Sequence, residues 1–448
     1  MPTGRPNIVL IFMDDMTHWA IGALGNSQVL TPNLDRLVER GCAFSHAVNQ
    51  GSWSPAVCMP ARAMLLTGRS LFHARAAVDA EDCPMLLGEV LAAAGYRTFF
   101  TGKWHSPDDW LRRGYQVVGP HATGGMLTSH WFSTAGGAVH SSERWVDAAL
   151  DFLAGHDGRP EPFFLHLAMH APHDPRQAPE RWLRRYPADD VRLPPNLLPA
   201  HPFDQGDRLV RDELLAGFPR TPAEVREHRR QYYAIVSHAD EQIGRLLDDL
   251  DRRGLAGDTV VVFSGDHGLA LGEHGLMGKQ SMYDHSVRVP LLVAGPGIPQ
   301  GLCVDDLVYQ ASIFPTLCHL AGISVPDSVD FQSLAPAFQG RPVGQRAIFG
   351  AYRDLQRLVR TRQWALAAYR PARRLQLFDV RHDPWQTRDL AADPAHTTVR
   401  TLLLALLRQL QDEHGDQDGH WTRHWTGTGC PMSPQRPEAD PVLQELDR

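Results

Sequence analysis

Short apolar runs alternate with amphipathic stretches over the first three-quarters of this chain of 448 residues. Four of the runs have the length and composition of buried strands, namely Asn7–Phe12, Tyr96–Thr101, Phe163–Ala168 and Thr259–Phe263. Strands that are apolar along their whole length and are separated by helices are typical of a parallel sheet covered on both faces. The sequence therefore predicts an α/β fold in which helices sandwich a mostly parallel sheet.

The longest predicted helix, Val225–Arg253, precedes the fourth strand, and Gly254 follows it at a place where glycine commonly ends a helix. A shorter one, Glu143–Ala154, precedes the third strand. The apolar residues of the long helix recur at helical spacing. They are Tyr232, Ile235, Val236, Ala239, Ile243, Leu246, Leu247 and Leu250.

The length of the chain and a change of character near residue 345 predict two domains, residues 1–345 and 346–448. The second domain begins with short β-like runs and continues with an apolar helix, which predicts a small antiparallel sheet with one helix. These elements are Ala347–Tyr352, Trp364–Tyr369, Leu375–Asp379 and the helix Val399–Leu410. We expect the polar last 30 residues to lie loosely on the surface.

Nine prolines interrupt the pattern between His173 and Pro222. A long, non-repetitive segment inside a compact domain is typically a binding loop or a lid. We refer to residues 173–222 as the proline-rich excursion.

Composition excludes several classes of protein. The formal net charge of −7 gives no sign of nucleic-acid binding, and no apolar run is long enough to span a membrane. The six cysteines form no Cys-x-x-Cys pair, so neither a zinc site nor a disulfide scaffold is expected. The N-terminus lacks the apolar core of a signal peptide, so we expect a cytoplasmic protein unless an export signal has been removed.

Polar side chains follow all four predicted strands. In open parallel sheets, ligands bind at the carboxyl ends of the strands. Each pair of polar residues alone could be an ordinary turn or helix cap, but turn chemistry does not explain why four strands should end in this way. The residues are Asp14 and Asp15, Lys103 and His105, His170 and His173, and Asp266 and His267, with Lys279 a little further along.

The aspartates Asp14, Asp15 and Asp266 supply hard oxygen ligands, which suit Ca²⁺ or Mg²⁺ better than zinc. His267 could complete the coordination. Because histidine is a less usual ligand of calcium, another divalent metal is also possible. The sequence therefore predicts a metal site.

Positive charges and histidines are expected at the same edge of the sheet. Lys103, Lys279 and Arg62 can neutralise a tetrahedral oxyanion. His105 and His173 can move protons near neutral pH.

Cys58 lies just before a predicted helix, Pro60–Leu66, which begins with a proline tolerated in a first turn. A helix N-terminus favours anions, and Arg62 lies one turn further on, on the same side. Two interpretations remain open on these residues alone: a nucleophilic or modified cysteine at an oxyanion site, and a half-buried structural thiol.

With these motifs the chain resembles the type I, formylglycine-dependent sulfatases of the alkaline phosphatase superfamily. The resemblance covers nearly the whole chain and implies an alkaline-phosphatase-like fold and a sulfuric ester hydrolase, acting on a sulfated carbohydrate or another sulfated small molecule. It is carried by residues 6–15, 31–37, 58–69, 101–105, 264–268, 377–380 and 383–384.

The resemblance implies that a separate maturation enzyme converts Cys58 to Cα-formylglycine (3-oxoalanine). One hydroxyl of its hydrate would attack sulfur, and the second would then expel sulfate as the aldehyde re-forms. It also implies that Asp14, Asp15, Asp266 and His267 hold the metal, with modified Cys58 as a further ligand.

The remaining roles also follow from the resemblance. Arg62 positions the diol, Lys103 and Lys279 bind sulfate oxygens, and His105 assists the release of sulfate. His173, with Lys279, is the expected proton donor to the leaving oxygen, although His170 could align with that role instead.

The alternative function is a phosphodiester or phosphonate monoester hydrolase on the same scaffold. Many members of the family carry asparagine where this chain has His267, whereas some sulfatases and those hydrolases carry an Asp-His pair. The hydrolases typically have Asp-Gln where this chain has Asp14 and Asp15, so we favour sulfate. A third alternative, a non-catalytic glycan-binding relative, finds no support because no expected catalytic position is missing.

Substrate specificity is expected in the proline-rich excursion, in Met126–Ser142 and in the C-terminal subdomain. Arginines of the excursion could contact an acidic glycan or could simply be solvated. They are Arg176, Arg181, Arg184 and Arg185.

Overall fold

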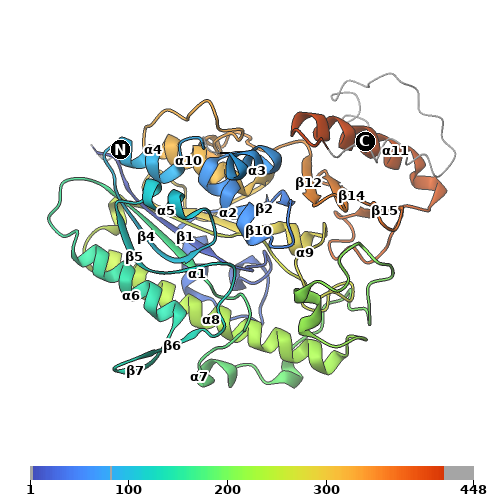
Figure 1. Cartoon of the computed structure of the whole chain (residues 1–448), viewed down its shortest axis with the longest axis horizontal. Coiled ribbons are helices and arrows are strands. Elements are labelled where there is room, and N and C mark those ends of the chain that lie inside the picture. The colour runs from blue at the N-terminus through green and yellow to red at the C-terminus, as the bar shows by residue number, and fades with distance from the viewer. Residues whose placement is uncertain (1–3, 81–82, 418–448) are drawn as a thin grey trace.

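The computed structural model describes residues 4–80 and 83–417, and its centre is a sheet of eight strands in the order β11-β2-β10-β9-β1-β8-β4-β5 (Figure 1). Strand β10 runs antiparallel to both of its neighbours, and every other pair is parallel. The prediction of a mostly parallel sheet is therefore confirmed. The strands are β1 (Asn7–Met13), β2 (Gly41–Val48), β4 (Arg97–Trp104), β5 (Val117–Thr123), β8 (Phe163–Met169), β9 (Thr259–Gly265), β10 (Arg288–Ala294) and β11 (Leu302–Tyr309).

The four strands that the sequence predicted are β1, β4, β8 and β9, and they lie side by side at the middle of the sheet. All four run in the same direction, so their carboxyl ends meet at one edge. The second strand is longer than predicted, because it continues through a register irregularity to Trp104. Lys103 therefore lies inside β4 and not in the loop after it.

Helices cover both faces of the sheet, as the alternating pattern predicted (Figure 1). Successive side chains of a strand point to opposite faces. Along β1, Ile8, Leu10 and Phe12 belong to one hydrophobic cluster, and the residues between them belong to the other. Helices α2 (Cys58–Thr67), α3 (Leu71–Asp79), α4 (Leu87–Ala93), α5 (Asp108–Gly114) and α10 (Ile313–Leu320) pack in the first cluster, and α1 (Pro32–Arg40), α6 (Ser141–Ala154) and α8 (Pro222–Arg252) pack in the second.

Helix α8 begins at Pro222, three residues earlier than the apolar pattern indicated. The Thr221 side chain accepts a hydrogen bond from the backbone N–H of Glu224, which satisfies one of the free donors of the first turn. Proline at the first helical position has no N–H to leave unpaired. Capping chemistry, rather than hydrophobic periodicity, sets this boundary.

The C-terminal part forms the small antiparallel sheet and the helix that the sequence predicted, at the upper right of Figure 1. A short strand from the first part of the chain, β3 (Gly51–Ser52), extends this sheet by pairing in parallel with β12. No pattern in the sequence indicated this pairing. The other elements are β12 (Ile348–Tyr352), β13 (Gln356–Arg360), β14 (Trp364–Tyr369), β15 (Arg374–Asp379) and α11 (Thr397–Glu413).

Strand β13 was missed because two of its five residues are arginines, which suggest an exposed segment. Both are buried and paired instead. Arg357 forms an ion pair with Asp416, and the guanidinium of Arg360 donates two hydrogen bonds to Asp284, at 3.0 and 2.9 Å. Asp284 begins α9 (Asp284–Val287), which belongs to the first part of the chain. The pair therefore fastens the small sheet to that part.

The proline-rich excursion is ordered and includes α7 (Glu180–Leu183) and a 3-10 turn, Arg211–Leu215. The Glu213 carboxylate accepts hydrogen bonds from the backbone N–H groups of Met277 and Gly278 and pairs with Arg220. The excursion is thereby attached directly beside Lys279. Its role as a binding loop or a lid stays a prediction.

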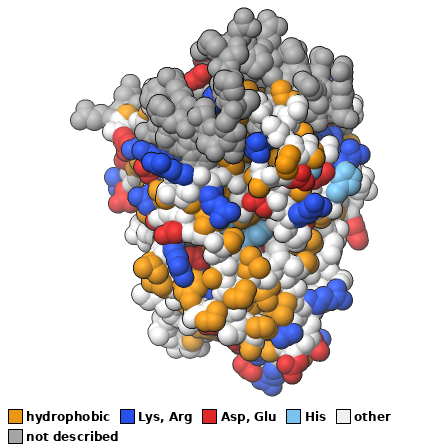
Figure 2. Space-filling model, turned by 90° about the vertical axis from the view of Figure 1, so that its right-hand side faces the viewer, with side chains coloured by type: hydrophobic (Ala, Val, Ile, Leu, Met, Phe, Trp, Pro, Cys, Tyr) orange, Lys and Arg blue, Asp and Glu red, His pale blue; other side chains and the backbone are white. Residues whose placement is uncertain are grey.

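Figure 2 shows the face on the C-terminal side, where basic and acidic side chains are interspersed and hydrophobic side chains gather in the lower half. The excursion contributes exposed apolar side chains at Leu209, Leu214 and Phe218. A hairpin of β6 (Trp131–Thr134) and β7 (Gly137–His140) lies elsewhere, near α6. Within residues 4–80 and 83–417, no helix has the length and apolar character needed to cross a lipid bilayer. The predicted loose tail of 30 residues lies outside the described residues.

Gly102→Ala should lower the free energy of unfolding by about 3 kcal/mol or more, as measured by chemical denaturation. Gly102 has a φ of 111°, and a Cβ there would lie 1.8 Å from the backbone oxygen of Ala168 in β8. Gly95→Ala is the matched control, because φ is 90° but nothing lies within 4 Å of the added Cβ. This variant should lose only about 1–2 kcal/mol of stability, because the only cost is backbone strain. Equal losses in the two variants would contradict the predicted clash.

Candidate active site

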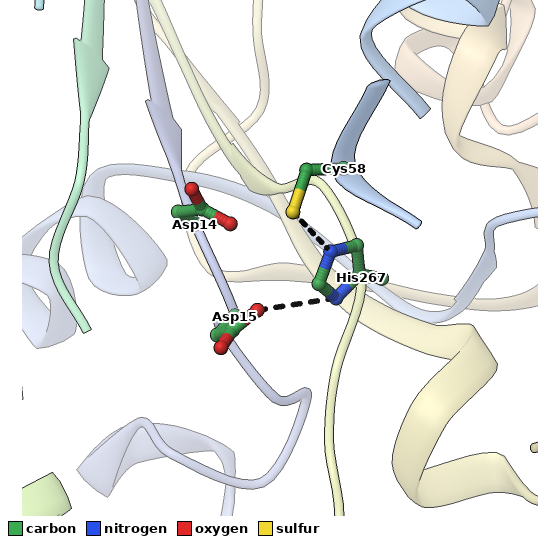
Figure 3. A group of neighbouring side chains, drawn as sticks. All are labelled: Asp14, Asp15, Cys58 and His267. Carbon is green, nitrogen blue, oxygen red and sulfur yellow. Dashed lines mark hydrogen bonds and ion pairs between the residues drawn. The ribbon is translucent and has the colours of Figure 1, made fainter. Parts of the chain in front are cut away.

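Four of the predicted site residues, Asp14, Asp15, Cys58 and His267, converge at the carboxyl edge of the sheet (Figure 3). All four are buried, and they offer metal-binding atoms that lie within 4.8 Å of one another. Nε2 of His267 is 3.2 Å from the Cys58 sulfur, and its Nδ1 is 3.5 Å from Oδ1 of Asp15. Residues far apart in the sequence therefore build one compact cluster.

The loop after β1 is held in an unusual conformation. Asp15 has a φ of 62°, a left-handed value that is uncommon for a residue other than glycine. The Tyr232 hydroxyl of α8 donates to the backbone oxygen of Asp15 (2.7 Å) and accepts from the N–H of Thr17 (3.0 Å). The Asp266 carboxylate accepts from the N–H of Asp15 (3.0 Å). These contacts fix where the two aspartates of the loop point.

Asp266 lies beside the four-residue cluster rather than in it. Its Oδ1 accepts hydrogen bonds from the backbone N–H groups of Asp15 and His267, and its Oδ2 is 3.3 Å from Arg62. Burial, together with the charge of Asp14, raises the pKa of Asp266 to about 7. Its role as a metal ligand stays a prediction.

Helix α2 begins at Cys58 itself, two residues earlier than predicted. Proline at the third helical position is compatible with this start, because the N–H groups of a first turn have no partner within the helix. The Cys58 side chain is only 2% exposed and lies 3.5 Å from Nζ of Lys279. The structure thus confirms a sulfur at a helix N-terminus and places a cation beside it.

The pKa of Cys58 distinguishes it from the other buried thiols. Burial acts to raise this pKa, but the charges of Lys103, Lys279 and His267 and a hydrogen bond from His105 hold it well below its ordinary value. Burial raises the pKa of Cys318 to about 11, although a backbone hydrogen bond opposes the rise. A thiol kept as an anion in a cationic pocket is typical of a reactive or modified position and not of a structural one.

Three buried cations face the acids of the cluster. Lys103 pairs with Asp14, and Nζ of Lys279 is 2.7 Å from Oδ1 of Asp15. Nη2 of Arg62 is 3.3 Å from Asp266 and 3.7 Å from Asp14. The predicted cationic residues are therefore all at the site, where they can bind a tetrahedral oxyanion. These ion pairs place each positive charge of the site beside a carboxylate.

The ligand set fits a divalent cation. Oδ1 of Asp14 is buried and has no hydrogen-bond partner in the part of the chain that the structure describes. Burial and the Cys58 anion act to raise the pKa of Asp14, but Lys103, His173 and Arg62 hold it well below its ordinary value. An ionised, unpartnered oxygen among other anionic ligands suits a hard cation such as Ca²⁺ or Mg²⁺.

The two histidines of the third strand end differ in their surroundings. His173 donates from Nδ1 to the backbone oxygen of Asp174 (2.7 Å), and Asp15 raises its pKa in opposition to burial. His170 has no partner at either ring nitrogen among residues 4–80 and 83–417, and burial and Lys103 hold its pKa well below the ordinary value. His173 can therefore carry a proton at the site, whereas His170 is held neutral.

Several polar contacts were not expected from the sequence. Asn49 donates to the backbone oxygen of Asp266 (2.9 Å), and Gln310 donates to that of Gly265. Tyr232 was counted among the apolar residues of the long helix, although its hydroxyl supports the loop after β1. Asp174 was also not predicted at the site, although it groups with Asp15 and His173. Its position directly after the predicted site residue His173 could have indicated this.

A mostly parallel sheet with acids and cations at the carboxyl ends of neighbouring strands, and a cysteine at the start of a helix beside them, is the arrangement expected of an alkaline-phosphatase-like hydrolase. Residues 6–323 match the family model described as Sulfatase, and residues 272–413 match the model described as N-sulphoglucosamine sulphohydrolase, C-terminal. The chain therefore belongs to the sulfatase family of the alkaline phosphatase superfamily, and it is a sulfatase. The family resemblance identified from the motifs is confirmed.

Relatives and solved structures agree with this assignment. A choline-sulfatase of Rhizobium meliloti is 30% identical, and the match covers 92% of this chain and 88% of that protein. The fold is shared with a protein solved in complex with its substrate D-glucosamine-2-N,6-O-disulfate (TM-score 0.74, 22% identity, 92% of this chain and 99% of the other). It is also shared with a phosphonate monoester hydrolase of Agrobacterium radiobacter (TM-score 0.73, 22% identity, 92% and 96%).

Proposed function

We propose that this sulfatase hydrolyses the sulfate ester of a carbohydrate or another small molecule through a formylglycine derived from Cys58. The observation that carries the proposal is the place of the Cys58 sulfur, at a helix start and within 3.5 Å of both His267 and Lys279. The hydrate of the aldehyde supplies one hydroxyl to attack sulfur and a second whose proton loss expels sulfate. A separate maturation enzyme would have to oxidise the thiol.

The residues around position 58 have separate roles in this proposal. Lys103 and Lys279 bind sulfate oxygens and stabilise the charge that develops on them. Arg62, one turn after Cys58 on α2, orients the hydrate. His105, which acts to lower the pKa of Cys58, takes the proton of the second hydroxyl when sulfate is released.

Asp14, Asp15 and His267 would hold the divalent cation, with residue 58 and Asp266 as further ligands. When bound, a hard cation lowers the pKa of a hydroxyl and draws negative charge from the sulfate group. Ca²⁺ is the first candidate because the set contains three carboxylates.

Phosphonate or phosphodiester hydrolysis is the second candidate, since the fold is shared with a phosphonate monoester hydrolase. Asp15 favours sulfate, because the phosphonate and phosphodiester hydrolases that the chain resembles typically carry glutamine at this position.

Two measurements on the matured enzyme test the proposal. Mass analysis of the peptide that contains residue 58 should show an aldehyde in place of the thiol. The kcat/KM for 4-nitrophenyl sulfate should exceed that for bis(4-nitrophenyl) phosphate, and a dominant phosphodiester rate would overturn the preference for sulfate. The protein has to be produced together with a maturation enzyme, because the thiol form lacks the nucleophile.

His173→Ala should slow an alkyl sulfate by about 10²-fold or more relative to 4-nitrophenyl sulfate. An alkoxide needs a proton as it leaves, and 4-nitrophenolate does not. Rates measured across leaving groups of rising pKa should therefore show a steeper dependence in the variant. His170→Asn is the control and should change all these rates by the same factor, because a residue held neutral and away from the leaving group gives no such dependence.

A further inference from the structure

The arginines of the proline-rich excursion differ sharply in burial. Arg181 and Arg184 have side chains that are 57% and 73% exposed, and they pair with Glu241 and Glu180. Arg176 is only 6% exposed. Because water does not solvate the charge of Arg176, neighbouring groups or a ligand have to stabilise it.

The guanidinium of Arg176 has no counter-ion among the residues that the structure describes. Nη1 donates to Nδ1 of His228 (3.2 Å), which is a neutral acceptor because burial and the charge of Arg176 lower the pKa of His228 to about 4. Nε and Nη2 are buried and have no partner. A buried, unpaired cation is costly, so its retention here points to an anionic ligand.

The side chain of Arg176 lies near the residues that support the loop after β1. Arg176 follows His173 by three residues, and His228 lies one turn before Tyr232 on the same side of α8. Tyr232 in turn holds the backbone of the loop at Asp15 and Thr17. Burial raises the pKa of Tyr232, and Arg176 is near enough for its charge to oppose that rise.

A second unpartnered group lies on the same loop. The Thr17 side chain is fully buried, and its Oγ1 has no hydrogen-bond partner among the described residues. Nε and Nη2 form the side edge of a guanidinium, which donates two parallel hydrogen bonds to a carboxylate or a sulfate. Both groups lie near Tyr232, and together they offer three donors.

We propose that Arg176, assisted by the Thr17 hydroxyl, binds a second anionic group of the substrate. This inference rests on the proposed function and deepens it. The substrate class is then a sulfate ester that also carries a carboxylate or a second sulfate, as an acidic sulfated sugar does. The reacting sulfate lies at residue 58, and the second anion lies on the side of the site formed by α8.

The test compares Arg176→Met with the wild-type protein on matched substrate pairs. One pair is 4-nitrophenyl 2-O-sulfo-glucuronide and its carboxyl-reduced analogue, and the other is glucosamine carrying 2-N,6-O-disulfate or 6-O-sulfate alone. The wild-type protein should prefer the dianionic member of at least one pair. In the variant this preference, as a ratio of kcat/KM values, should fall roughly 10- to 100-fold. The pair that responds identifies the anion as carboxylate or sulfate.

Arg184→Met is the control, and its preference should equal that of the wild-type protein. The unfolding temperature distinguishes a binding arginine from a structural one. Loss of a purely structural arginine would lower it. Without ligand, Arg176→Met should unfold at a higher temperature, because the variant no longer buries an unpaired charge. A lower unfolding temperature together with equal losses on all four substrates would overturn the subsite.

Binding of the dianionic sugars to Cys58→Ala protein, measured by calorimetry, separates this inference from the proposed function. If the matured enzyme hydrolyses 4-nitrophenyl sulfate but Cys58→Ala and Cys58→Ala/Arg176→Met bind the dianions equally, only the subsite fails. If no sulfate ester is hydrolysed, the proposed function fails, and the affinity difference between these two proteins still decides the subsite.

Discussion

Cys58→Ala should reduce turnover of 4-nitrophenyl sulfate by about 10⁴-fold or more, because alanine supplies no nucleophile to sulfur. The surrounding Lys103, Lys279 and His267 remain in place, so the variant should still fold and bind sulfate. Far-ultraviolet circular dichroism and the unfolding temperature check the fold, and initial rates check the loss. A variant that retained full activity would refute the formylglycine mechanism.

Cys58→Ser should fail at a different step. A serine hydroxyl can attack sulfur once, but it has no second hydroxyl whose proton loss could expel the sulfate. We therefore expect one burst of 4-nitrophenolate, at most equal to the enzyme concentration, and then no turnover. Mass analysis should find one sulfo group on the peptide containing residue 58. Cys303→Ala is the control, because Cys303 is exposed and lies away from the site on β11, and it should keep wild-type rates.

The layered sheet and most of the site could be predicted because they depend on local patterns. Apolar runs of strand length imply burial on both faces, and parallel strands bring their carboxyl ends to one edge. Asp14 and His267 are distant in sequence, yet their place after two such runs was enough to bring them together. The helix at Cys58 followed in the same way from a proline and an apolar run.

Features that depend on contacts between distant parts of the chain could not be predicted. Arg357 and Arg360 look like surface residues until their buried partners are known. The pairing of Gly51–Ser52 with β12 has no local signal, because a strand of two residues has no periodicity. Arg176 cannot be told from Arg184 by sequence, since both are arginines in the same polar excursion.

Asp15→Asn should remove most of the affinity for the divalent cation and lower kcat by about 10³-fold. Asp15 takes part in the cluster with Asp14 and Cys58 and in a second cluster with His173 and Asp174, so its charge acts on both. Asparagine keeps the shape but leaves Lys279, at 2.7 Å from Oδ1, without its counter-charge. The electrostatic potential at the metal site then becomes more positive, which opposes binding of the divalent cation.

Metal content by elemental analysis and the rise in unfolding temperature on adding Ca²⁺ measure this loss without reference to turnover. A ligand that binds only the folded protein raises its stability, so the rise should be clear in the wild-type protein and nearly absent in Asp15→Asn. Asp249→Asn is the control, since Asp249 is a buried acid of α8 that pairs with Arg252 and Arg253 away from the site. It should keep the metal even if it lowers stability. Stoichiometric metal in Asp15→Asn would place the cation on other ligands and would leave Asp15 as the partner of Lys279 alone.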